Sequence, residues 1–113
     1  MTQSEPIIRG GAMHPDLGAR VASGRLTVEG DRLRIVGKDL SVEMPLQGLD
    51  LEAGGHNDEQ LFFRHATQPQ WTLTTSDHAI LDELAPLAGE DLQRQIRRAR
   101  KLRRSSARLW VPA

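Results

Sequence analysis

The sequence predicts a mainly β domain of the α+β class, in which a strongly bent antiparallel sheet of six or seven short strands is followed by a C-terminal helix. Between residues 18 and 75, apolar side chains recur at every second position, which is typical of half-buried strands. After residue 75 they recur at helical spacing. The 113 residues, 38% of them hydrophobic, are enough for one core.

Residues 1–17 show no sustained period, and we expect them to form an irregular N-terminal arm. Four residues in this stretch are typical of turns: Pro6, Gly10, Gly11 and Pro15. Ile7 and Ile8 are the only residues of this arm that we expect to be held against the body.

Residues 18–89 are expected to form the β-domain, which includes a first short helix. Its first two strands carry Leu26 with Val28 and Leu33 with Ile35, and Gly30-Asp31 between them predicts a hairpin turn. A second turn at residues 37–39 leads to a strand that begins at Leu40. That strand ends at Pro45, which suits only a strand end or a sheet edge because proline cannot donate to the ladder.

The later strands are shorter. Leu49 and Leu51 flank Asp50 in a fourth strand, and residues 53–60 form a polar loop. Two more strands follow over Leu61–Arg64 and Trp71–Thr75, and Val21 can add a seventh before Gly24. Of the adjacent Phe62 and Phe63, one is expected in the core and one partly exposed, and Trp71 is expected in the core.

Ser76 or Asp77 can cap a helix over about His78–Ala85. A second helix, over residues 90–113 with its tail, begins near Glu90 and has an apolar face: Leu92, Ile96, Ala99 and Leu102. A pleckstrin-homology-like fold fits this order of strands and helices. A six-stranded small barrel and a plain α+β sheet fit it as well.

Charge is divided sharply along the chain. Residues 1–93 hold seven basic and fifteen acidic side chains, whereas residues 94–113 hold eight basic and no acidic ones. The predicted site residues for an anionic surface or a membrane flank are Arg94, Arg97, Arg98, Arg100, Lys101, Arg103, Arg104, Arg108 and Trp110. Two alternatives remain open: a nucleic-acid contact, and a solvated helix face supported by the helix dipole.

The last residues favour the membrane interpretation. A basic cluster followed by Trp110, Val111, Pro112 and Ala113 is how a membrane-spanning helix commonly begins on its cytoplasmic side. We therefore expect the natural protein to continue into a membrane span that this chain lacks; a frayed C-terminus is the alternative. The N-terminus has no signal-peptide pattern, and the expected location is cytoplasmic, at the inner face of the cell membrane.

No catalytic, cofactor or metal motif is present, and we expect a non-enzyme. Cysteine is absent, and the histidines (His14, His56, His65 and His78) lack metal-ligand spacing. His78 is expected to form an exposed pair with nearby acids. Two carboxylate pairs at spacings common on any surface are the remaining acid–base candidates: Asp50 with Glu52, and Asp58 with Glu59.

Three segments, residues 24–35, 44–49 and 71–81, resemble the N-terminal β-rich domain of certain bacterial membrane-anchored zinc metallopeptidases. In that family the small domain is followed by a basic stretch, a transmembrane helix and an HExxH peptidase domain. The resemblance implies a cytoplasmic accessory domain. The zinc ligands and the catalytic glutamate of the family have no counterpart here.

The function that the sequence favours is a non-catalytic accessory or interaction domain of a larger membrane-anchored protein, with a basic helix next to the membrane. Its expected partners are an anionic membrane surface or a neighbouring domain of the parent protein. An exposed edge strand could also accept a peptide by strand addition. The alternative is a free-standing nucleic-acid-binding protein that uses the arginine-rich helix, and no cofactor is expected.

Overall fold

The computed structural model describes residues 7–55 and 59–109, and the side chains in these ranges as far as residue 102. The elements in chain order are β1 (Ile8–Met13), η1 (Pro15–Leu17), β2 (Ala22–Glu29), β3 (Arg32–Gly37), β4 (Leu40–Pro45), β5 (Asp50–Gly54), β6 (Gln60–Arg64), β7 (Thr72–Thr75), α1 (Ala79–Leu84), η3 (Ala85–Leu87) and α2 (Glu90–Leu109).

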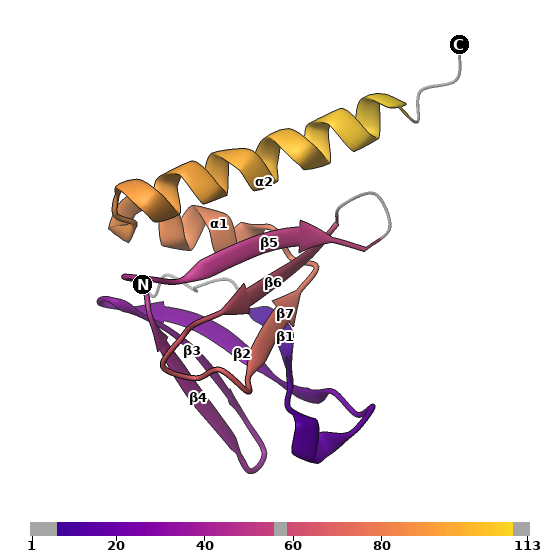
Figure 1. The fold of residues 1–113 in the computed structure, drawn as a ribbon, viewed down its shortest axis with the longest axis vertical. Helices are drawn as coiled ribbons and strands as arrows, with labels where there is room; N and C mark the ends of the chain where they lie inside the picture. Colours follow the sequence, from indigo (N-terminus) through magenta and orange to yellow (C-terminus); the bar gives the residue numbers. More distant parts are fainter. Residues whose placement is uncertain (1–6, 56–58, 110–113) are drawn as a thin grey trace, which may run out of the picture.

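The strands form one antiparallel sheet in the order β4-β3-β2-β1-β7-β6-β5. The sheet curls into a half-barrel, and α2 lies beside β5 while α1 contacts β2 (Figure 1). The predicted fold class is therefore confirmed: a mainly β α+β domain whose bent seven-stranded sheet is followed by C-terminal helices. Within the described residues, no helix is long and apolar enough to cross a membrane.

The predicted meander of β2, β3 and β4 forms as expected. Gly30 has a φ of 61°, which the tight turn after β2 needs and which glycine adopts without a steric penalty. The pairing places Leu26 opposite Ile35 and Leu33 opposite Met44, so the apolar members of each alternation face the core.

The expectation of an irregular arm over residues 1–17 is wrong for residues 8–13, which form the central strand β1. This strand pairs with β2 on one side and with β7 on the other. Its glycines allow close packing: a Cβ on Gly10 would lie 2.6 Å from the Thr74 carbonyl oxygen and 2.7 Å from Leu26 Cδ1. The seventh strand is thus β1, whereas Val21 is exposed and precedes β2.

One hydrophobic core joins the inner face of the sheet to both helices. Phe63 is completely buried, while Phe62 on the opposite face is partly exposed, as the alternation predicts. The core residues contributed by the helices are Ile80, Leu81, Leu84, Leu92, Ile96 and Ala99. The first turns of α2 therefore belong to the same core as the sheet, which fixes the helix beside β5.

The half-barrel leaves two edge strands, β4 and β5. The side-chain amide of Gln68 donates a hydrogen bond to the Glu43 carbonyl at 3.4 Å, so the backbone carbonyl of Glu43 faces away from β3. Pro45 lies two residues further along the strand, and its backbone therefore faces the same way. Pro45 therefore takes the edge position predicted for it. The outer edge of β5 faces α2 instead, and this is where the candidate site lies.

Candidate interaction site on the C-terminal helix

The cations of α2 differ in whether a carboxylate accompanies them. Arg94 Nη2 lies 3.0 Å from Oδ1 of Asp91, one helical turn earlier, and Arg100 Nη2 lies 2.7 Å from Asp82 Oδ1 in α1. Both pairs are largely exposed, so each contributes only a fraction of a kcal/mol to stability, roughly 0.2–1. Their effect at the surface is nevertheless to neutralise two of the predicted site residues.

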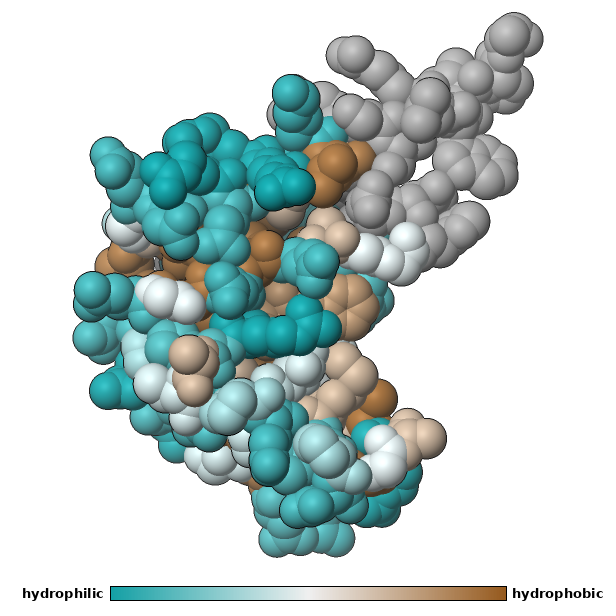
Figure 2. Space-filling view, in the orientation of Figure 1, coloured by the Kyte–Doolittle hydropathy of each residue, from teal (hydrophilic) through white to brown (hydrophobic). Residues whose placement is uncertain are grey.

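Arg97, Arg98 and Lys101 are exposed, and in the part of the chain whose side chains are described none of them forms an ion pair. The spacing of four residues puts Arg97 and Lys101 on one face of α2, opposite the face that buries Leu92 and Ile96. Figure 2 shows hydrophilic side chains over the outer side of α2. The remaining predicted site residues lie outside the described side chains: Arg103, Arg104, Arg108 and Trp110.

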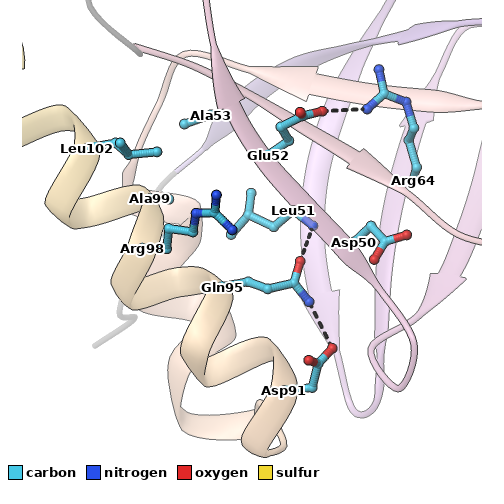
Figure 3. A pocket seen from close by; sticks show the side chains of 10 residues that line it. All are labelled: Asp50, Leu51, Glu52, Ala53, Arg64, Asp91, Gln95, Arg98, Ala99 and Leu102. Carbon is cyan, nitrogen blue, oxygen red and sulfur yellow. Dashed lines mark hydrogen bonds and ion pairs between the residues drawn. The ribbon is translucent and has the colours of Figure 1, made fainter.

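A groove of about 530 Å³ runs between α2 and β5 (Figure 3). Its lining includes Leu51 and Ala53 from the strand and Arg98, Ala99 and Leu102 from the helix. Leu102 is 39% exposed, although it continues the apolar face of α2. This groove therefore combines an exposed leucine of α2 with the outer edge of a strand.

Gln95 closes one end of the groove by bonding to the strand backbone. Its Oε1 accepts the Leu51 N–H at 2.6 Å, and its Nε2 donates to the Leu49 carbonyl at 3.0 Å and to Asp91 Oδ2 at 3.0 Å. These partners fix the orientation of the amide, because a backbone N–H can only donate and the other two groups only accept. The carboxamide of Gln95 thus makes the two hydrogen bonds that a neighbouring strand would make.

Beyond Gln95 the edge of β5 is open. The N–H and C=O of one strand residue point to the same side, and so do those of residues two positions away. Since the Leu51 N–H points to α2, the Leu51 C=O and both backbone groups of Ala53 also face the groove. No hydrogen bond joins these three groups to any residue whose side chain or backbone the structure describes.

The outer face of β5 next to the groove is acidic. Asp50 and Glu52 are exposed there, and Arg64 on β6 lies opposite Asp50 in the register and 3.0 Å from Glu52. Asp50 forms no ion pair with a described residue, so this face keeps a net negative charge. Arg64 also lies over the ring of Phe62 at 5.9 Å, which holds its guanidinium close to the sheet.

The described histidines have structural partners. His65 is buried, and its Nε2 lies 2.8 Å from the Gln47 carbonyl while its Nδ1 accepts the Thr67 N–H at 3.0 Å. His14 Nδ1 accepts the Asp16 N–H, and the centroid of its ring lies 4.6 Å from that of the Trp71 ring. Trp71 itself is partly buried and packs against the core, rather than being fully buried in it. His56 and Asp58 lie outside the described residues.

His78 was expected to pair with acids on the surface, and this is wrong. Its Nε2 lies 2.8 Å from the Glu59 carbonyl, and no ion pair joins it to Asp77 or Asp82. Asp77, one residue before the cap position at His78, supplies the predicted hydrogen bond to the start of α1, since its Oδ1 accepts the Ala79 N–H at 3.0 Å. Within the described ranges, no three metal-ligating side chains lie close enough together to hold an ion.

Sequence reasoning missed Gln95, the residue that shapes the groove. The available signal is its position, because it lies four residues after Asp91 and directly before Ile96, on the flank of the buried stripe. A glutamine there is compatible with solvent exposure, and only the placement of α2 beside β5 reveals its partners.

Neither the known protein families, nor the curated proteins, nor the solved structures include a match to this chain. The resemblance to the accessory domain of membrane-anchored metallopeptidases therefore stays a prediction.

Proposed function

We propose that this chain is a non-catalytic interaction domain that holds the outer face of α2 against an anionic membrane surface. It would act as a cytoplasmic accessory part of a larger membrane-anchored protein, of the metallopeptidase class that the sequence resembles. The observation that carries the proposal is the contrast on α2: Arg97 and Lys101 face outward with no carboxylate partner among the described residues, whereas Arg94 and Arg100 are paired.

The expected strength fits a tethered domain. A basic side chain near an anionic leaflet contributes about 1 kcal/mol. Arg97 and Lys101, the two on the outer face, would therefore contribute about 2 kcal/mol together. That is too weak to recruit a free protein from solution at low concentration, but it suffices to orient a domain that another segment already holds at the membrane.

The proposal is tested by flotation with vesicles of phosphatidylcholine alone and vesicles that also contain phosphatidylserine. Replacing Arg97 and Lys101 by glutamine should weaken binding to the anionic vesicles about thirtyfold, the equivalent of about 2 kcal/mol. The matched control replaces Arg9 and Arg25 by glutamine, because these exposed arginines of β1 and β2 carry the same charge at a distance from α2. If both double variants lost binding equally, a diffuse net-charge effect would replace the proposed helix face.

A nucleic-acid contact by the same helix remains the alternative. Duplex DNA would then bind more tightly than anionic vesicles, and its affinity would fall steeply with salt, by about one logarithmic unit per phosphate contact for each tenfold rise in salt. Replacing Arg97 and Lys101 by glutamine would then reduce the slope of log affinity against log salt by about 2. Such a result would transfer the function of Arg97 and Lys101 from a lipid surface to phosphate backbones.

A further inference from the structure

We propose that the open edge of β5 is a strand-addition site for an extended peptide segment in which apolar and basic side chains alternate. The segment would lie in the groove between β5 and α2 and pair with Leu51 and Ala53. This inference does not depend on the membrane proposal, because it uses the strand side of α2 rather than its outer face.

The backbone supplies the first argument. Three outward groups of β5, the Leu51 carbonyl and the Ala53 N–H and carbonyl, face the groove without a hydrogen-bond partner among the described residues. One residue of an added antiparallel strand, placed opposite Ala53, would exchange two hydrogen bonds with it. A second residue would donate to the Leu51 carbonyl. Strand addition is the interaction that such a row of unpaired groups favours.

Gln95 shows that this edge accepts a partner and limits how far the partner can extend. Its carboxamide already bonds to the Leu51 N–H and the Leu49 carbonyl, in the manner of a neighbouring strand. A bound segment would therefore stop at Leu51 (Figure 3). The footprint is short, and the peptide would enter from the end of the groove near Leu102.

The side chains of the groove define the partner's pattern. Successive residues of an added strand alternate between the two faces of the sheet. Those level with Leu51 and Ala53 would point inward, toward the apolar surface of Ala99 and Leu102. Those between them would point outward, toward Asp50 and Glu52, of which only Glu52 has an ion-pair partner among the described residues, Arg64. Apolar residues therefore suit the inward positions and basic residues the outward ones.

Arg98 supplies hydrogen-bond donors for the side of the bound segment that faces away from β5. An added strand has a new outer edge whose carbonyls require donors. The guanidinium of Arg98 lines the helix side of the groove and makes no hydrogen bond to a described residue, so its donors are available to those carbonyls. The positive charge of Arg98 also repels a basic peptide side chain on the helix side, so the basic residues of the peptide are restricted to the outward positions.

The test uses an acetylated, amidated hexapeptide of alternating lysine and valine, with the glutamate–valine peptide as its counterpart, and measures affinity by titration of backbone amide NMR signals. The lysine peptide should bind, with the largest shift at the Ala53 amide, and the glutamate peptide should bind at least about fivefold more weakly. Absence of binding by the lysine peptide, or shifts confined to the outer face of α2, would refute the proposal.

Variants separate backbone pairing from charge. Ala53→Pro removes the outward N–H while keeping the net charge, and it should lower affinity at least about fivefold. Ser41→Pro, at an outward position of the other edge strand β4, is the matched control and should bind as the parent does. Asp50→Asn with Glu52→Gln should weaken the lysine peptide only. Pairing at β5 would be contradicted if Ala53→Pro bound the peptide as tightly as the parent, or if Ser41→Pro alone lost affinity. The double variant Arg97→Gln with Lys101→Gln should leave peptide binding intact.

Discussion

Gln95 Oε1 lies 2.6 Å from the Leu51 backbone nitrogen, so a side chain of α2 occupies part of the free hydrogen-bonding edge of β5, an edge strand of the sheet. The same amide reaches the Leu49 carbonyl. Because these contacts join residues more than forty positions apart, they position α2 beside β5 and direct its cationic face outward.

Replacing Gln95 by alanine removes both of these bonds to β5. We expect the free energy of unfolding to fall by about 2 kcal/mol, since two half-buried backbone groups lose their partner. Urea denaturation measures the loss, and amide exchange at Leu51 should become faster. Arg97→Ala, on the outer face of the same helix, is the control and should change stability by less than about 0.5 kcal/mol. A Gln95→Ala variant as stable as this control would mean that the apolar face of α2 alone positions the helix.

His65 joins two loops, one before β5 and one after β6. With Nε2 protonated, the ring donates to the Gln47 carbonyl and its Nδ1 accepts the Thr67 N–H. His65→Phe keeps a ring in the buried position but leaves both partners unpaired, and it should destabilise the fold by about 2–4 kcal/mol. Thr67→Ala removes a hydroxyl while retaining the N–H, so thermal unfolding should show a smaller loss, of about 1 kcal/mol or less. Equal losses would indicate that the hydroxyl, 2.9 Å from Nδ1, is the important group.

Gly10 tests the packing of β1. A methyl group there would meet the Thr74 carbonyl at 2.6 Å and the Leu26 side chain at 2.7 Å, and the backbone atom cannot move without disturbing β7. Gly10→Ala should therefore cost about 1–3 kcal/mol in chemical denaturation. Gly89→Ala, whose added methyl meets nothing within 4 Å, should cost less than about 1 kcal/mol. A tolerated Gly10→Ala would contradict the close approach of β1 to its neighbours.

The pair of Asp82 and Arg100 links α1 to α2, but it should add little stability. The two side chains are 75% and 41% exposed, so water and salt screen their attraction even at 2.7 Å. A double-mutant cycle with Asp82→Asn and Arg100→Gln should give a coupling of about 1 kcal/mol or less, which decreases as salt is added. A coupling of several kcal/mol that is insensitive to salt would show that the pair is effectively buried.

Much of the fold follows from local patterns in the sequence. The alternation of Leu33, Ile35, Val42 and Met44 predicts two strands, and the structure confirms that these side chains share the buried face of the sheet. The capping role of Asp77 and the beginning of α2 at Glu90 were also predictable, since both depend on neighbours within a few residues.

The parts that were missed depend on residues distant in the sequence. Gly10 and Gly11 indicate a turn when they are read locally, but the positions of Leu26 and Thr74 make them the residues that let β1 enter the middle of the sheet. In the same way, the roles of Gln95 and His65 are set by backbone groups of other segments, which no local pattern specifies.

In the proposed function, α2 meets an anionic surface with Arg97 and Lys101, which form no ion pair with a described residue. The most direct measurement is the ratio of the partition coefficients of the intact chain on phosphatidylserine-containing and pure phosphatidylcholine vesicles at low ionic strength. These two cations predict a preference of about thirtyfold for the anionic vesicles, which decreases as salt is added. Equal partitioning on the two kinds of vesicle would contradict the account.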